Sequence, residues 1–211
     1  MKTAVVFVHG LFLNGAEFTL LRRRLSTALG FESHRFSYPT VRGSMSATLA
    51  ALSQFVARIE ADRIHFVGHS LGGIVLCRFF EREPCDRAGR VVLLGTPLAG
   101  SRSAQAVARH AWLRRVVGPL VAEELVHTRE PRAWRCEREL GVIAGTRPMG
   151  LGRFFARFDE DCDGTVAVSE TRLPGLKAHV TLPVSHMGML ASPVVARHVA
   201  NFLQEGRFES R

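Results

Sequence analysis

Short apolar runs alternate with longer amphipathic segments along most of the chain. Short strands are expected at 3–8, 34–38, 64–67, 90–94, 140–144 and 176–182. The runs at 64–67 and 90–94 are almost entirely apolar, as in strands that are buried on both faces of a parallel sheet. Between the expected strands, apolar side chains recur at the spacing of one helix face, in 14–30, 44–59, 70–83 and 193–205. The alternation predicts an α/β fold with a mostly parallel central sheet and helices on both of its faces.

This alternation is interrupted between residues 101 and 138. The segment has helical propensity, is rich in arginine, breaks at Gly118-Pro119 and contains both tryptophans, Trp112 and Trp134. Such an excursion is typical of a lid over a functional site, with an ordinary pair of packing helices as the alternative. We therefore expect a single domain over 1–211, in which 101–138 is a helical lid or cap insertion.

The net charge of +9 comes almost entirely from arginine, since Lys2 and Lys177 are the only lysines. A charge of this size can attract nucleic acid, acidic membranes or anionic small molecules. The arginines are dispersed, however, and no aromatic residues alternate with them in a nucleic-acid-binding motif. We expect no nucleic-acid partner, and a weak interaction with anionic lipid surfaces stays open.

The chain has four cysteines: Cys77, Cys85, Cys136 and Cys162. Their spacing matches neither a C-x-x-C pair nor a set of zinc ligands, so reduced thiols are expected. No apolar run approaches the roughly 20 residues that span a membrane. The first apolar run is too short for a signal peptide and is interrupted by His9-Gly10. These features predict a cytoplasmic protein.

The most informative motif follows the run at 64–67, which breaks into Gly68-His69-Ser70-Leu71-Gly72 and then an apolar helix. Strand, sharp turn and helix form the context in which a G-x-S-x-G sequence presents a serine hydroxyl from a strained turn. Side chains at 68 and 72 would collide with the neighbouring strand and helix, which explains the glycines. Ser70 is thus the candidate nucleophile, with a tight turn that carries no chemistry as the alternative.

A serine hydroxyl is a weak nucleophile unless a base removes its proton, and the base needs an acid to orient it. Among the nine histidines, His186 is the candidate base because it lies in the loop after the last predicted strand. Asp163 is the preferred acid, because Gly164 allows a turn there and the apolar residues that follow lead back toward the core. The acidic residues at 159–161 are expected to form a solvated turn.

These three residues all follow predicted strands, and the carboxyl ends of parallel strands meet at one edge of a sheet. Their order in the chain, Ser70, Asp163, His186, is that of the α/β-hydrolase arrangement. The backbone N–H groups of Leu71 and Leu11 are the expected donors of an oxyanion hole. Of the other histidines, those at 9 and 69 are expected to pack or hydrogen-bond locally, and His198 is expected to be solvated.

Together these motifs resemble those of small bacterial α/β-hydrolases, and they are most similar to the lipase and esterase group with a minimal fold. The residues that carry the resemblance are Val8-His9-Gly10, Gly68-His69-Ser70-Leu71-Gly72-Gly73, Gly95-Thr96-Pro97, Asp163-Gly164-Thr165-Val166 and Ser185-His186-Met187-Gly188. The resemblance implies the α/β-hydrolase fold and cleavage of a small-molecule acyl ester through an acyl-enzyme, with no cofactor and no metal. It gives Ser70 the role of nucleophile, His186 that of base and then acid, and Asp163 that of the orienting carboxylate.

Two alternatives remain at this stage. An acyltransferase or a thioesterase would use the same three residues, and supplying an alcohol or thiol acceptor would distinguish transfer from hydrolysis. A catalytically silent scaffold of the same fold would bind anionic partners through its charge, with a salt-dependent affinity that Ser70→Ala leaves unchanged. The sequence makes no prediction of oligomeric state.

Overall fold

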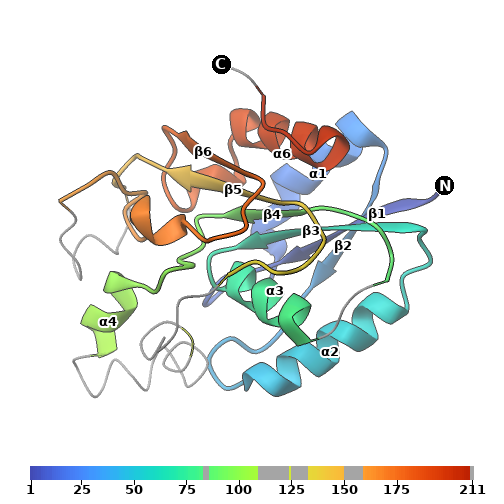
Figure 1. Ribbon diagram of the computed structural model, residues 1–211, viewed down its shortest axis with the longest axis horizontal. Coiled ribbons are helices and arrows are strands. Elements are labelled where there is room, and N and C mark those ends of the chain that lie inside the picture. Colours follow the sequence, from blue (N-terminus) through green and yellow to red (C-terminus); the bar gives the residue numbers. More distant parts are fainter. Residues whose placement is uncertain (83–85, 109–123, 125–132, 150–158, 210–211) are drawn as a thin grey trace.

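A parallel sheet of six strands lies at the centre of the computed structural model, which describes residues 1–82, 86–108, 124, 133–149 and 159–209 (Figure 1). The strands are β1 (Thr3–Val8), β2 (Glu32–Phe36), β3 (Arg63–His69), β4 (Val91–Leu94), β5 (Leu140–Gly145) and β6 (Ala178–Leu182). Their order across the sheet is β2-β1-β3-β4-β5-β6, and every neighbouring pair is parallel. The predicted parallel sheet is confirmed.

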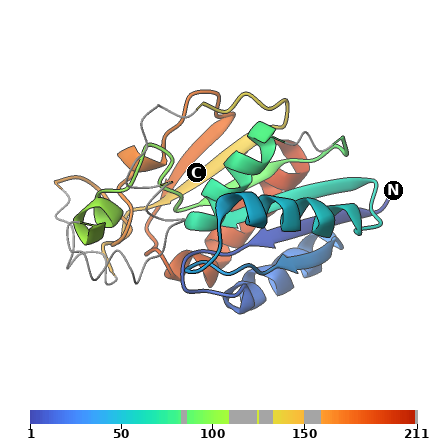
Figure 2. The same cartoon turned by 90° about the horizontal axis from the view of Figure 1, so that it is seen from below.

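Helices cover both faces of this sheet, as predicted. The described helices are α1 (Thr19–Leu29), α2 (Met45–Ala57), α3 (Leu71–Arg82), α4 (Arg102–Ala108) and α6 (Pro193–Glu205), with shorter 3-10 turns η1 (Ala16–Phe18), η4 (Ser169–Thr171) and η5 (Gly188–Leu190). Helices α2 and α3 pack on one face of the sheet, and α1 and α6 pack on the other (Figures 1 and 2). Ser44 and Ser192 cap α2 and α6, since each hydroxyl accepts a backbone N–H of the first turn.

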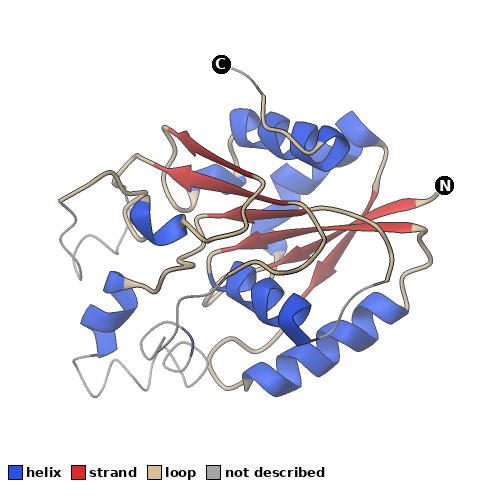
Figure 3. Ribbon diagram, viewed as in Figure 1, coloured by secondary structure: helices blue, strands red, loops and turns tan. Residues whose placement is uncertain are grey.

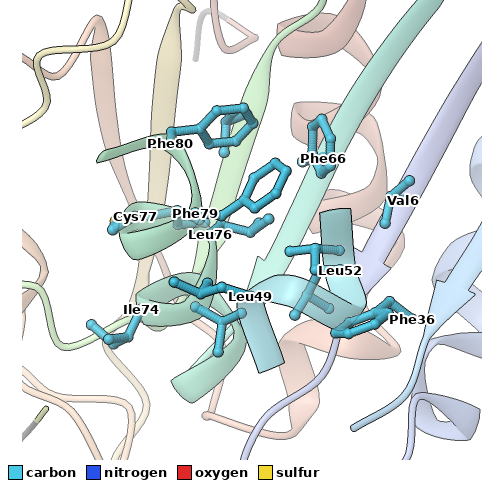
Figure 4. Packing of buried hydrophobic residues seen from close by; sticks show 14 of the residues in the cluster. Val6, Phe36, Leu49, Leu52, Phe66, Ile74, Leu76, Cys77, Phe79 and Phe80 are labelled. Carbon is cyan, nitrogen blue, oxygen red and sulfur yellow. The ribbon is translucent and has the colours of Figure 1, made fainter. Parts of the chain in front are cut away.

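The core is divided into two layers by the sheet, because successive side chains of a strand point to opposite faces. In β1, Val5 and Phe7 face α1 and α6, whereas Val6 faces α2 and α3. Figure 4 shows the layer under α2 and α3, in which aromatic and aliphatic side chains of strands and helices interlock. Its labelled members are Val6, Phe36, Leu49, Leu52, Phe66, Ile74, Leu76, Cys77, Phe79 and Phe80.

Strand β2 lies two residues before the predicted run at 34–38. The register of the β1–β2 pair runs from Ala4 opposite Glu32 to Val8 opposite Phe36. Beyond Phe36 the backbone leaves the sheet, because the N–H of Tyr38 donates to the ring of His9 and not to a strand partner. The strand therefore ends where this side-chain contact begins.

The prediction that His198 is solvated was wrong. Its side chain lies on α6 and is only 5% exposed. After α6 the chain turns at Gly206, and Phe208 folds back against the helix, with its ring 6.0 Å from that of His198 and 4.9 Å from that of Phe202. The C-terminal segment thus covers a position that the helix alone would leave exposed.

Most of the predicted lid at 101–138, including Trp112, lies outside the described residues. The described parts are residues 101–108, which include α4, together with Glu124 and residues 133–138. Helix α4 is attached to the loop after β5, because Ser103 Oγ donates to the Thr165 carbonyl at 2.6 Å and Arg102 pairs with Glu170. Glu124, a further described residue of this segment, accepts a hydrogen bond from Arg78 of α3 at 2.8 Å. No helix among the described residues is long and apolar enough to cross a bilayer.

A buried histidine in β3 makes the stability of this fold depend on pH. The Nδ1 of His65 accepts the Arg90 N–H at 3.0 Å, and its ring stacks on Phe31 at 5.5 Å. Burial first, and then the charges of Arg63, Arg90 and Arg138, lower the pKa of His65 to about 3. The unfolded chain protonates this histidine near pH 6.5. Stability is therefore fully present above that pH and is lost as the pH falls toward 3.

We expect His65 alone to account for a loss of about 2 kcal/mol between pH 7 and pH 5. In His65→Asn, the Asn carbonyl oxygen takes over the hydrogen bond from Arg90 N–H but does not titrate. Denaturant unfolding at both pH values should therefore show a smaller pH-dependent loss in this variant than in the wild type. Equal losses in the two proteins would contradict the assignment, whatever the stability of the variant at pH 7.

Candidate active site

Ser70 occupies a strained turn between β3 and α3. Its φ of 53° is left-handed, and among the described non-glycine residues only Phe12 shares a positive φ. The turn is held from both sides, because Ser70 N–H donates to the Leu94 carbonyl at 2.9 Å and Gly73 N–H donates to the Ser70 carbonyl at 3.0 Å. This confirms the predicted strand, sharp turn and helix, a geometry that lifts the side chain of Ser70 away from the sheet.

The predicted need for glycine on both sides of Ser70 is also confirmed. A β-carbon on Gly68 would lie 2.8 Å from the Gly73 α-carbon. One on Gly72 would lie 2.5 Å from the His9 carbonyl oxygen and still closer to that of Val8. Helix α3 therefore starts in direct backbone contact with the end of β1. This contact brings the loop after β1 beside the loop that carries Ser70.

Asp163 and His186 form a buried pair at the same edge of the sheet. His186 Nδ1 lies 2.7 Å from Asp163 Oδ2, and their side chains are 9% and 1% exposed. The other carboxylate oxygen accepts the N–H groups of Thr165 at 2.9 Å and Val166 at 2.7 Å. The two residues are also joined through the backbone, since His186 N–H donates to the Asp163 carbonyl at 2.9 Å.

This arrangement sets the tautomer of His186. An ionised carboxylate only accepts hydrogen bonds, so the proton of the neutral imidazole is on Nδ1. The Nε2 atom then carries a lone pair that can accept a proton. Because both the ring and the backbone of His186 are bound to Asp163, the direction of that lone pair is fixed by the Asp163 loop.

His69 connects this pair to Ser70. Its Nε2 lies 3.0 Å from the His186 carbonyl oxygen, and the two rings are 4.7 Å apart. Burial first, and then the neighbouring His186, lower the pKa of His69 well below its usual value, so its ring is neutral and Nε2–H is the donor. The described contacts include no hydrogen bond between Ser70 Oγ and His186. In ligand-free enzymes such a bond is often long and shortens only when substrate is present.

The loops after four strands converge here. Ser70 follows β3 and Gly95 follows β4, while Asp163 and His186 lie beyond β5 and β6. A β-carbon on Gly95 would lie 2.9 Å from Asp163 Oδ2 and 3.0 Å from His186 Nδ1. In Figure 3 the arrowheads of the central strands point toward the left of the view, which is the side of the molecule where α4 lies. This is the carboxyl edge of the sheet, as expected from the chain order.

The two predicted oxyanion-hole donors belong to segments that adjoin Ser70. Leu71 N–H opens α3, and Leu11 N–H lies in the loop after β1. No hydrogen bond from either N–H to another described residue is present. A β-carbon on Gly10 would lie 3.2 Å from the Ser70 β-carbon, so this loop lies directly against the nucleophile. Two unused donors are thus available within the same small region.

The acidic turn at 159–161 is exposed, as expected, and its role is structural. Glu160 accepts hydrogen bonds from Arg102 of α4 and from Ser169 Oγ at 2.8 Å. Over the described parts of the chain, no cluster of three or more His, Cys, Asp or Glu residues could hold a metal ion. The carboxylate of this region that faces the candidate base is Asp163.

Tyr38 and Thr40, which belong to no functional motif in the sequence, contact the loop after β1 beside Ser70. Tyr38 bonds to His9, and the Thr40 hydroxyl accepts the N–H of Phe12. The only signal in the sequence is that Tyr38 is the one tyrosine of the chain and ends the second predicted strand. Their relation to the Ser70 region depends on the pairing of β1 with β2.

Comparison with known proteins supports the fold. The model of the alpha/beta hydrolase family matches residues 5–203. A comparison with curated protein sequences gives no significant match. The lipase BlEst2 of Bacillus licheniformis, in its mature form, is 19% identical, with a TM-score of 0.72 over 98% of this chain and 93% of that one.

Two further solved structures are similar. Phospholipase PlaB from Legionella pneumophila is 16% identical, with a TM-score of 0.70 over 94% of this chain and 56% of that one. A pyrethroid hydrolase from Sphingobium faniae is 17% identical, with a TM-score of 0.64 over 97% and 98% of the two chains. At these identities the likeness shows a shared fold.

Proposed function

The chain belongs to the alpha/beta hydrolase family, and on that premise we propose that it cleaves carboxylic esters through an acyl-enzyme formed on Ser70. The observation that carries this proposal is the buried Asp163–His186 pair, at 2.7 Å, beside a serine held at φ 53°. Family membership makes the chain a hydrolase. The nucleophile, the base and the ester substrate are inferred from this geometry.

In the proposed acylation step, His186 Nε2 takes the proton of Ser70 Oγ as the oxygen attacks the ester carbonyl. The carbonyl oxygen becomes an oxyanion that accepts the N–H groups of Leu11 and Leu71. When the intermediate collapses, the C–O bond to the alcohol breaks and His186 gives its proton to the departing alkoxide. The product is an acyl-Ser70 ester and a free alcohol.

Deacylation repeats these steps with water as the nucleophile. His186 removes a proton from the water, the oxyanion forms again, and Ser70 leaves with the proton from His186. Asp163 keeps its hydrogen bond to Nδ1–H throughout and stabilises the positive charge that the ring carries in each transition state. Each oxyanion donor is expected to contribute about 3 kcal/mol to the stabilisation of that transition state.

Covalent labelling tests the proposed nucleophile. After treatment with a fluorophosphonate, the wild-type protein should gain the mass of one phosphonyl group, and peptide mapping should place it on Ser70. Ser70→Ala should gain none, because the attacking oxygen is absent. Ser37→Ala, which removes an exposed serine after β2, is the matched control and should label like the wild type.

The same samples are then assayed with p-nitrophenyl esters of two to twelve carbons. Hydrolysis by the wild type and its loss in Ser70→Ala would support the ester substrate. An adduct that persists in Ser70→Ala would show that Ser70 is not the nucleophile. If Ser70 is labelled but no ester is hydrolysed, the assignment of Ser70 as nucleophile stands and the proposed substrate class is overturned.

A further inference from the structure

The loop after β1 is held in place by the segment that follows β2. Three hydrogen bonds join them: Tyr38 N–H to His9 Nε2 at 3.2 Å, Tyr38 Oη–H to the His9 carbonyl at 2.9 Å, and Phe12 N–H to Thr40 Oγ1 at 3.2 Å. The rings of His9 and Tyr38 also stack, with centroids 4.5 Å apart. His9, Tyr38 and Thr40 are 0%, 6% and 6% exposed. We call these three residues the loop clamp.

The ring of His9 is bonded at both nitrogens. Because Nε2 accepts from Tyr38 N–H, the proton of the neutral ring is on Nδ1. Nδ1–H then donates to the Gly10 carbonyl oxygen at 2.9 Å. Burial lowers the pKa of His9, which favours this neutral form. The His9 ring therefore links the Tyr38 backbone N–H to the Gly10 carbonyl, so the position of the Tyr38 backbone fixes the direction of that carbonyl.

The direction of the Gly10 carbonyl decides the direction of the Leu11 N–H. Both belong to one planar trans peptide, in which C=O and N–H point in opposite directions. The carbonyl oxygen of Gly10 is fixed by His9 Nδ1–H and by Leu13 N–H at 3.3 Å. The Leu11 N–H consequently points away from the loop clamp and keeps no partner among the described residues.

Phe12 shows that the shape of this loop is imposed from outside. Its φ of 61° lies in the left-handed region, which is strained for a bulky residue. The ring is 60% exposed, so its own packing offsets little of that strain. The hydrogen bond from Phe12 N–H to Thr40 and the two bonds made by Tyr38 are the contacts that hold the strained loop in place.

We propose that Tyr38 and Thr40 are positioning residues, which act through His9 and Phe12 to hold the Leu11 N–H in place for the oxyanion. The inference rests on the proposed function, since only a reaction through a tetrahedral intermediate has an oxyanion to bind. Neither residue contacts the reacting atoms. Their effect is on the transition state, because the oxyanion exists there and not in the bound ester.

Tyr38→Phe and Thr40→Val test this role with small changes. The first variant keeps the ring that stacks on His9 and removes only the hydroxyl. The second keeps the shape of the side chain and removes the acceptor for Phe12 N–H. Complete loss of one oxyanion donor lowers kcat by about 10²- to 10³-fold. Loosening the loop should cost less, so we expect each variant to lower kcat for p-nitrophenyl butyrate about tenfold, with KM within twofold of wild type.

A second readout separates positioning from general destabilisation. A trifluoromethyl ketone adds to an active-site serine and forms a hemiketal oxyanion, which imitates the tetrahedral intermediate. Its inhibition constant should rise in each variant by the same factor by which kcat/KM falls. Thr40→Ser keeps the hydroxyl and should restore both values to those of the wild type.

Thr48→Val is the matched control for Thr40→Val. Thr48 is also buried, but its hydroxyl donates to the carbonyl of Ser44, the N-cap of α2, and makes no described hydrogen bond to the loop after β1. We expect this variant to lose stability while keeping kcat and the inhibition constant. Thermal unfolding of all variants verifies that each is folded at the assay temperature.

The results distinguish this proposal from the proposed function. If the wild type hydrolyses esters and folded Tyr38→Phe and Thr40→Val keep kcat within twofold, the positioning role is overturned and the proposed function stands. If Thr48→Val loses kcat as much as Thr40→Val does, the effect is one of stability and the positioning role is again overturned. If the wild type neither labels nor hydrolyses any ester, both proposals fall together.

Discussion

Replacing Asp163 with asparagine is expected to lower kcat for ester hydrolysis by on the order of 10⁴-fold while leaving the protein folded. Asp163 has two separate tasks in the structure. One carboxylate oxygen accepts the N–H groups of Thr165 and Val166, and the other faces His186 Nδ1 at 2.7 Å. Asparagine can still accept the N–H groups of Thr165 and Val166, but it presents a donor in place of an acceptor to His186 Nδ1.

The reversal follows from the hydrogen-bonding groups of the amide. Its single carbonyl oxygen can take over the bonds from Thr165 and Val166, which places the NH₂ group toward His186. An NH₂ group only donates, so His186 Nδ1 must become the acceptor and the proton of the ring moves to Nε2. The atom that should accept the proton of Ser70 is then already protonated. The base is lost although no heavy atom has moved.

Steady-state kinetics on Asp163→Asn and on Asp161→Asn measure this effect. Asp161→Asn is the matched control, because Asp161 lies two residues before Asp163 and its side chain is exposed. Asp161→Asn should therefore keep wild-type kcat, and both variants should unfold within a few degrees of the wild type. If Asp163→Asn keeps more than a tenth of wild-type kcat, Asp163 does not orient the base.

Gly72→Ala is expected to have the largest effect on stability, with a loss of about 3 kcal/mol or more. The added methyl group would overlap the carbonyl oxygens of Val8 and His9. These atoms belong to the last residue of β1 and to the residue after it, and β1 is paired with β2 on one side and β3 on the other. Backbone between two strands cannot move aside as a side chain can, so helix α3 has to shift away from the sheet.

That shift should also reduce activity in the protein that remains folded. Leu71 N–H opens the same helix turn, and the loop after β1 lies on the other side of the contact. A displaced helix therefore separates the two proposed oxyanion donors. Denaturant unfolding gives the change in stability, and kcat measured below the unfolding transition gives the change in activity.

Gly30→Ala is the control for this glycine substitution. Gly30 ends α1 with a φ of 66°, and a β-carbon there would meet no other atom within 4 Å. The substitution costs only the strain of a left-handed alanine, about 1 kcal/mol, and should leave kcat unchanged. A Gly72→Ala protein as stable as Gly30→Ala would mean that β1 and α3 are not in the close contact described.

The six strands and helices α1, α2, α3 and α6 could be predicted from the sequence, but some of their limits could not. Strand β1 and helix α6 begin and end at the residues that their apolar patterns indicate. Strand β2 does not, because its end depends on a hydrogen bond from Tyr38 to a histidine 29 residues away. A local pattern contains no information about such a partner.

The site divides in a similar way. The turn at Ser70 and its flanking glycines are local features, and the structure places Asp163 and His186 at the same edge of the sheet. Of the lid predicted at 101–138, the structure describes only residues 101–108, Glu124 and residues 133–138. The lid therefore stays a prediction.

The alternation of strands and helices, the parallel sheet and the strained turn at Ser70 follow from the amino-acid sequence alone. These depend on the burial of neighbouring residues and on backbone conformation, which are encoded within a few positions. The contact of Phe208 with His198, and the hydrogen bonds by which Tyr38 and Thr40 hold the loop beside Ser70, are seen only in the folded chain. Those contacts join segments that meet only after the sheet has formed, because the pairing of strands brings distant side chains within hydrogen-bonding distance.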